Sequence, residues 1–143
     1  LVLSRQSLPN TTDGDAVRYG AETVVDTAHP QMVLVGTGSE VSVCVAAAKL
    51  LQAEGVNTNV VSMPSFDRFA AQASKYRETV FPANVPVLSV EAGVTFGWSQ
   101  YADASVGIDR FGASAPGSTV MSKLGISPEN VAARARELVT RPK

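Results

Sequence analysis

The sequence contains few of the residues that build metal centres and nucleophilic catalytic sites. Cys44 is the only cysteine and His29 is the only histidine. An intramolecular disulfide is therefore impossible, and neither a zinc cluster nor a Cys-His catalytic pair is supported. Cys44 falls on the apolar side of a predicted helix, which indicates a buried and unreactive thiol. His29 precedes Pro30 in a predicted turn.

Charge of either sign is also scarce. Charged residues make up 17% of the 143 residues, and the formal net charge is −1. Such a balance provides no excess of basic residues for binding nucleic acid or an anionic membrane surface. The apolar runs are only as long as strands, so we expect no transmembrane helix, and the chain does not open with a basic-then-apolar signal segment. These features predict a cytoplasmic protein that binds neither nucleic acid nor membrane.

The stretch from Met32 to Glu54 has the pattern of a strand, a turn and a helix. Met32 to Val35 is apolar throughout, as in a strand buried on both faces, and Gly36-Thr37-Gly38 then breaks the run. Beyond the turn, apolar residues recur at helical spacings of three and four: Val41, Cys44, Val45, Ala48 and Leu51. The stretch is therefore half of a β-α-β unit.

The glycine turn has two interpretations. Glycines between a strand and a helix can cradle a phosphate, because backbone N–H groups and the helix dipole favour an anion there. However, Val41 stands where the dinucleotide fingerprint requires a third small residue. Thr37 and Glu40 also have the spacing of a capping box, in which Thr37 would accept an N–H and Glu40 would fold back on the cap. The capping box favours a structural role over a nucleotide cradle.

Patterns elsewhere predict a three-layer αβα fold of the α/β class. Its mixed, mostly parallel sheet has about five strands, with the first strand antiparallel and near an edge. If that strand pairs with Met32 to Val35, the short connection at His29-Pro30 requires the antiparallel arrangement. The other predicted strands cover residues 57–63, 85–90 and 106–110, after a first strand at 22–27. Helices are predicted at 66–80, 97–104, near 120 and from 128 onward, with Ser65 and Ser127 as starts.

Three loops should lie along one edge of this sheet, where ligands collect in open α/β folds. They are Gly36-Thr37-Gly38, Met63-Pro64-Ser65 and Glu91-Ala92-Gly93. Glu91 is the only carboxylate directly at a strand end, and it has no histidine, lysine or second acid beside it in the sequence. Trp98 and Tyr101, at helical spacing, are expected to be core residues. The residues alone therefore favour a structural or regulatory domain over an autonomous enzyme.

The chain begins as though inside a strand. Leu1-Val2-Leu3 is apolar, and the polar stretch from Ser4 to Gly20 has the composition of an interdomain linker. We therefore expect a fragment in which residues 1–20 are the end of a preceding domain and a linker, and residues 21–143 are a domain.

Six motifs occur in an order that resembles the C-terminal domain of transketolase. They span nearly the whole chain: Leu3-Ser4-Arg5-Gln6, Gly36-Thr37-Gly38-Ser39-Glu40-Val41, Val60-Val61-Ser62-Met63-Pro64, Tyr76-Arg77-Glu78, Val90-Glu91-Ala92-Gly93 and Gly107-Ile108-Asp109-Arg110-Phe111-Gly112-Ala113-Ser114. The resemblance implies a homodimeric enzyme of the pentose phosphate pathway that transfers a two-carbon ketol unit between sugar phosphates. It also implies thiamine diphosphate and a divalent metal, Mg or Ca, as cofactors.

In that family the cofactor is held by the N-terminal and middle domains, which would be the partners of this chain. The resemblance thus implies an accessory domain without the catalytic centre, inactive on its own. One site residue carries over: Arg5 matches the family arginine that contacts the sugar phosphate. A guanidinium suits that role because it stays charged and offers paired N–H donors. The alternative is a regulatory module that binds a small anion or nucleotide at the strand carboxyl edge.

Overall fold

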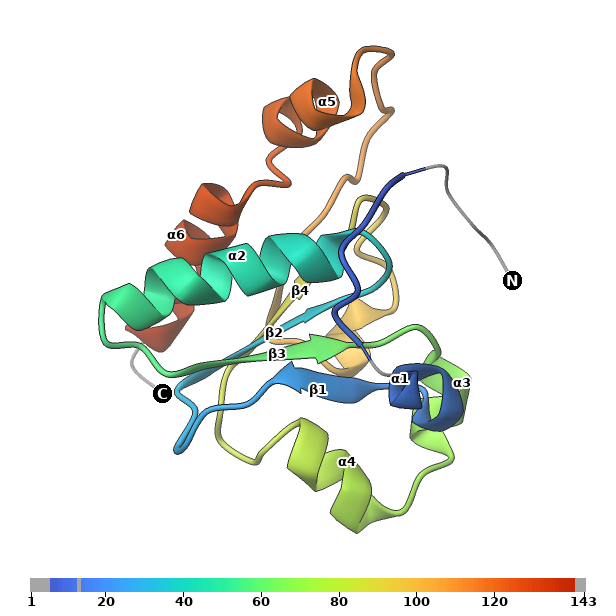
Figure 1. Ribbon diagram of the computed structural model, residues 1–143, viewed down its shortest axis with the longest axis vertical. Helices are drawn as coiled ribbons and strands as arrows, with labels where there is room; N and C mark the ends of the chain where they lie inside the picture. Colours follow the sequence, from blue (N-terminus) through green and yellow to red (C-terminus); the bar gives the residue numbers. More distant parts are fainter. Residues whose placement is uncertain (1–5, 13, 141–143) are drawn as a thin grey trace.

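The computed structural model describes residues 6–12 and 14–140, and they form three layers (Figure 1). A five-stranded sheet lies between two layers of helices. One layer contains α2 (Glu40–Ala53) and α6 (Pro128–Val139), with α5 (Gly117–Lys123) leading into α6. The other contains α3 (Phe66–Ala70) and α4 (Ser74–Val80), with α1 (Asp15–Tyr19) beside α3. The predicted αβα architecture is therefore confirmed.

The strand order of the sheet is β1-β3-β2-β4-β5. The strands are β1 (Glu22–Val25), β2 (Met32–Gly36), β3 (Thr58–Ser62), β4 (Val87–Val90) and β5 (Ala104–Val106). β1 is the antiparallel edge strand, and the other pairings are parallel. The mixed sheet is as predicted, but β1 pairs with β3 and not with its sequence neighbour β2, because the β2-α2-β3 crossover places β3 between them.

Side chains alternate between the two layers along the buried strands. Met32 and Leu34 of β2 pack with α2 and α6, whereas Val33 and Val35 pack with the aromatic residues of the opposite layer. All four are completely buried. This two-sided burial explains the continuous apolar run in β2, since a central parallel strand has no polar face. Cys44 lies in the α2 side of this core, as predicted.

The helix expected over residues 66–80 is wrong as a single element. It is broken into α3 and α4 at Ala71 to Ala73, where Ala73 has an extended ψ of 144°. Gln72 Nε2 donates to the carbonyl of Arg68 at 2.8 Å, which satisfies a carbonyl at the end of α3. The break lets aromatic residues of both helices pack together, with Phe69 at 5.4 Å from Phe81 between ring centroids. Ser65 is the N-cap of α3, as predicted, and accepts from Arg68 N.

Two further boundaries differ from the sequence prediction. The expected helix at 97–104 is only a 3-10 turn, Trp98–Gln100, and the last strand lies at Ala104–Val106, not at 106–110. Asp103 fixes this earlier start, since its backbone N donates to Val87 O and its carboxylate accepts from Val87 N. The segment predicted as a linker contains the short helix α1.

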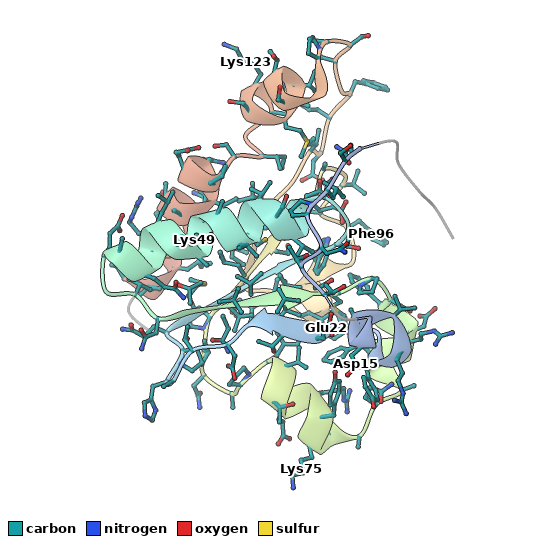
Figure 2. All side chains as sticks on the ribbon, in the orientation of Figure 1. Asp15, Glu22, Lys49, Lys75, Phe96 and Lys123 are labelled. Carbon is teal, nitrogen blue, oxygen red and sulfur yellow. The ribbon has the colours of Figure 1, made fainter. Side chains whose placement is uncertain are left out.

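Exposed charges lie scattered over the surface of the molecule. Lys49, Lys75 and Lys123 sit on three different helices and are exposed (Figure 2). Among residues 6–12 and 14–140, no helix is long and apolar enough to cross a membrane.

Candidate functional site

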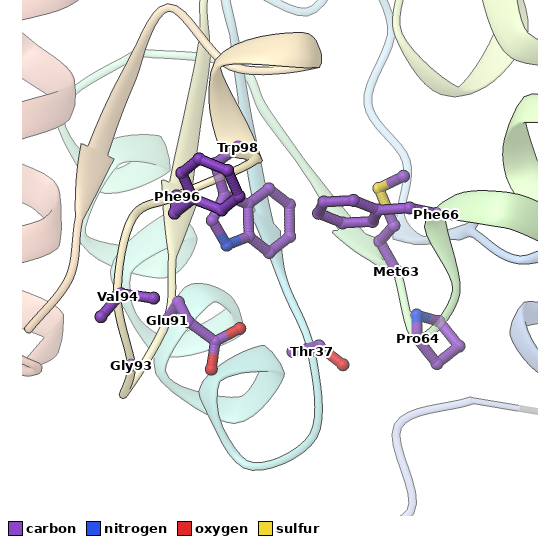
Figure 3. Close-up of a pocket in the computed structure, with 9 residues that line it drawn as sticks. All are labelled: Thr37, Met63, Pro64, Phe66, Glu91, Gly93, Val94, Phe96 and Trp98. Carbon is purple, nitrogen blue, oxygen red and sulfur yellow. The ribbon is translucent and has the colours of Figure 1, made fainter.

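Three strands end together at one edge of the sheet. Gly36 at the end of β2 is in register with Ser62 of β3 and with Val90 of β4. The loops that follow these strands therefore meet, as the sequence predicted. They enclose an open pocket of about 460 Å³ (Figure 3), with nine lining residues: Thr37, Met63, Pro64, Phe66, Glu91, Gly93, Val94, Phe96 and Trp98.

The pocket has an aromatic wall. Phe66 from the start of α3 meets Trp98 edge to face, with ring centroids 4.9 Å apart and an interplanar angle of 78°. Trp98 is buried, as predicted for a core residue, whereas Phe96 beside it is 92% exposed. Tyr101 also packs into this layer and contacts Phe66. The wall is thus rigid at its base and apolar at its open rim.

Glu91 is the carboxylate of the pocket and points into it toward Thr37 (Figure 3). The side chain is partly buried at the end of β4. Burial raises the pKa of the Glu91 carboxyl above its usual range, and the negative charge of Glu40 raises it further. The pocket therefore has one carboxylate in its lining, Glu91, and a second acid, Glu40, near enough to act on it. The sequence prediction had assigned Glu40 to a helix cap.

The predicted capping box at the start of α2 is wrong. Ser39 occupies the N-cap position and makes no side-chain bond to the helix backbone. Its hydroxyl instead donates to Glu40 Oε1 at 2.6 Å, so the Glu40 carboxylate bonds to a neighbouring hydroxyl and not to a backbone N–H, as a capping box requires. Thr37 lines the pocket. Glu40 is nevertheless only 5% exposed in the first helical turn, where its charge disfavours a phosphate.

The loop after β4 is held against the loop after β5. Asp109 accepts from Thr95 N at 2.8 Å and from Thr95 Oγ1 at 2.9 Å, and Ile108 N donates to Gly93 O at 2.7 Å. Gly107 leaves no space for a side chain, because a Cβ would lie 2.5 Å from Thr95 Cγ2 and 3.1 Å from Gly93 O. These contacts give a physical reason for glycine and aspartate in the Gly107-Ile108-Asp109 motif.

The structure separates the candidate residues. Arg5 lies outside the described residues. His29 is exposed in a turn with φ of 53°, and Cys44 is completely buried, which raises the pKa of its thiol. Sequence reasoning missed Phe66 as the wall of the pocket. It placed the Glu40 carboxylate at the glycine turn, although within a capping box that the structure does not form. A signal for Phe66 existed, since it follows the strand-end motif Met63-Pro64-Ser65 directly.

The described residues offer little for metal or redox chemistry. Among residues 6–12 and 14–140, no group of three His, Cys, Asp or Glu side chains could hold a metal ion. The pocket instead combines a carboxylate, a hydroxyl and aromatic surface. This combination suits a cationic or hydrogen-bond-donating group with apolar parts, because aromatic faces and carboxylates both attract cations.

The family match and the curated relatives agree. The family described as "Transketolase-like TK C-terminal domain" matches residues 20–127. A transketolase of Nostoc sp. is 47% identical over 146 residues, which cover 97% of this chain and 22% of the relative. Transketolase 1 of Saccharomyces cerevisiae is 44% identical over 141 residues, covering 97% and 21%. The chain thus spans about a fifth of the length of the curated relatives it matches.

Solved structures show the same fold. Transketolase from Leishmania mexicana superposes with a TM-score of 0.88 at 48% identity, covering 92% of this chain and 20% of that one. Transketolase from Campylobacter jejuni gives a TM-score of 0.80 at 28% identity, covering 94% and 21%. By its family match, its relatives and its fold, this chain belongs to the transketolase C-terminal domain family.

Proposed function

We propose that residues 21–143 are the C-terminal domain of a transketolase, and that residues 1–20 are the end of a preceding domain and a linker. The enzyme would transfer a two-carbon ketol unit from a ketose phosphate to an aldose phosphate with thiamine diphosphate and Mg or Ca. The observation that carries this proposal is the similarity to transketolases over 97% of the chain. A homodimer and a cytoplasmic location stay predictions from the family and the sequence.

We propose further that this domain is accessory and that the cofactor is held by the N-terminal and middle domains. The residues at its carboxyl edge do not fit a metal-bound diphosphate. Glu40 occupies the first turn of α2, and Glu91 lies across the same edge, so an anion would meet negative charge there. The described part of the chain also offers no cluster of three metal-ligating side chains. The same two acids disfavour a regulatory anion or nucleotide at this edge.

Arg5 is the substrate-binding residue in this proposal. Its guanidinium would hold the phosphate group of the sugar through paired charge-assisted hydrogen bonds. Lysine would be a weaker replacement because it cannot present two parallel donors.

Steady-state kinetics of the full-length enzyme test this role. Arg5→Ala should raise the KM for the donor and the acceptor sugar phosphates by roughly tenfold to a hundredfold, since a hydrogen bond to a charged group contributes about 1.5–3 kcal/mol. The apparent affinity for thiamine diphosphate should change far less. Arg134→Ala is the matched control, because Arg134 is exposed on α6 and pairs with Glu137. An unchanged KM for both sugars would contradict the assignment, and ketol transfer by the 143-residue chain alone would contradict an accessory role.

A further inference from the structure

We propose that the carboxyl-edge pocket docks a basic side chain from the part of a transketolase polypeptide that precedes this domain. This inference rests on the proposed function and adds an interface to it. The docked arginine or lysine would pair with Glu91 and lie against the aromatic wall of Phe66 and Trp98.

The rim of the pocket is apolar and exposed. Phe96 is 92% exposed and Val94 is 61% exposed, and both line the mouth of the pocket. Figure 3 shows Phe96 beside Trp98. Exposed apolar surface at the mouth of a hollow is typical of an interaction site, whereas isolated apolar residues elsewhere on a surface need no explanation. The loop that carries Phe96 is held in place by Asp109, so this surface is preorganised.

The pocket is also acidic. The ion pairs found among residues 6–12 and 14–140 are Arg134 with Glu137 and Arg136 with Glu54, so Glu91 has no cationic partner there. Glu40 lies behind it and adds negative charge at the same edge. A basic group is therefore the complement that this pocket selects, and the aromatic wall beside it would add a cation–π contact.

The part of the polypeptide that precedes this domain would lie near the pocket. Residues 6–12 lie on the side of the molecule toward which β2 and β3 point (Figure 1). The relatives that match this chain are about five times longer, and the matching family is the C-terminal domain. The preceding part of such a polypeptide would therefore enter this domain beside the pocket. That proximity favours this occupant over an unrelated protein.

Photo-crosslinking in the full-length enzyme tests the occupant. A benzophenone amino acid at position 96 should form crosslinks that mass spectrometry maps to peptides from the preceding part of the polypeptide. The same group at Leu50, an exposed position of α2, is the control and should not capture those peptides. Capture of this domain from a second copy, or no capture at position 96, would overturn the proposal.

Hydrogen exchange tests the role of the charge. In the full-length enzyme, Glu91→Gln should speed amide exchange in residues 91–98 by about thirtyfold or more, because losing one partner of a desolvated ion pair typically costs over 2 kcal/mol. Glu129→Gln is the matched control, since Glu129 is exposed in the first turn of α6. Equal exchange in the two variants would refute the pairing. Ketol transfer by the wild-type enzyme is measured separately. Absence of this activity would contradict the proposed function, whereas a negative crosslinking or exchange result in an active enzyme would contradict only the docking proposal.

Discussion

Gly20 is the position at which one added methyl group should disturb both the fold and the pocket. It ends α1 with φ of 91°, and its carbonyl accepts from Ser65 N at 3.1 Å. A Cβ at this position would lie 2.2 Å from the backbone nitrogen of Phe69 and 2.6 Å from the carbonyl oxygen of Ser65. Both are backbone atoms of the segment that carries Phe66, so the clash cannot be relieved by rotating a side chain.

The cost of Gly20→Ala has two parts that a second glycine separates. A positive φ costs an alanine about 1–2 kcal/mol, and overpacking costs about 1–3 kcal/mol. Gly14 has φ of 106° but no atom within 4 Å of an added Cβ. Gly14→Ala should therefore lower the free energy of unfolding by about 1–2 kcal/mol, and Gly20→Ala by about 2–5 kcal/mol.

Thermal denaturation of the chain followed by circular dichroism measures the difference. At about 3 °C per kcal/mol for a domain of this size, Tm should fall by roughly 3–6 °C for Gly14→Ala and by roughly 6–15 °C for Gly20→Ala. The fluorescence of Trp98, the only tryptophan of the chain, gives a second readout because Phe66 packs on it. The emission maximum of Trp98 should shift in Gly20→Ala but not in Gly14→Ala. Equal losses of Tm in the two variants would refute the packing argument.

Two further substitutions test the core and the acidic edge. Phe69→Ala should lower the free energy of unfolding by about 3–5 kcal/mol in urea denaturation, because Phe69 is 1% exposed and packs on other aromatic rings. The control is Phe111→Ala, at a residue that is 99% exposed, and this variant should change the free energy of unfolding by less than about 0.5 kcal/mol. Burial and Glu40 raise the pKa of Glu91 in the folded chain, so the folded state is penalised once pH rises through that raised value. Glu91→Gln should therefore raise the Tm of the isolated chain at about pH 7, and this gain should vanish near pH 3, where the carboxyl is protonated in both states. A gain of equal size at both pH values would show that the charge is not its cause.

The buried strands were predictable because their chemistry is local. β2 and β4 are short, mainly apolar runs, and β3 has two adjacent valines. Glycine or proline lies near the ends of each strand, and each strand lies within a few residues of its predicted place. The start of α6 was equally clear, since Ser127 precedes Pro128 and accepts from Asn130 N, as an N-cap should. Such signals need only neighbouring residues, and no long-range contact overrides them here.

The sequence falls short where a contact between residues far apart in the chain determines the partner or the end of an element. β1 is the antiparallel edge strand that the sequence predicted, but its partner is β3 because the crossover places β3 there, which no residue in β1 reveals. The break between α3 and α4 follows from packing of Phe69 and Phe81 in one aromatic layer. β5 starts at Ala104 because Asp103 is held by Val87. In the last two cases helical or strand periodicity continued in the sequence, while tertiary packing ended or moved the element.

The start of α2 shows how a wrong local assignment can still lead to a sound conclusion. A capping box would have disfavoured a phosphate by occupying the free N–H groups of the first turn. The side chains do not form that box. The Ser39 hydroxyl donates to the Glu40 carboxylate, and the Ser39 side chain makes no bond to the helix backbone. What disfavours an anion is the buried charge of Glu40, reinforced by Glu91 across the edge. Unlike occupied N–H groups, which would only exclude an anion, this charge also attracts a cation, so the proposed ligand of the edge is a basic group.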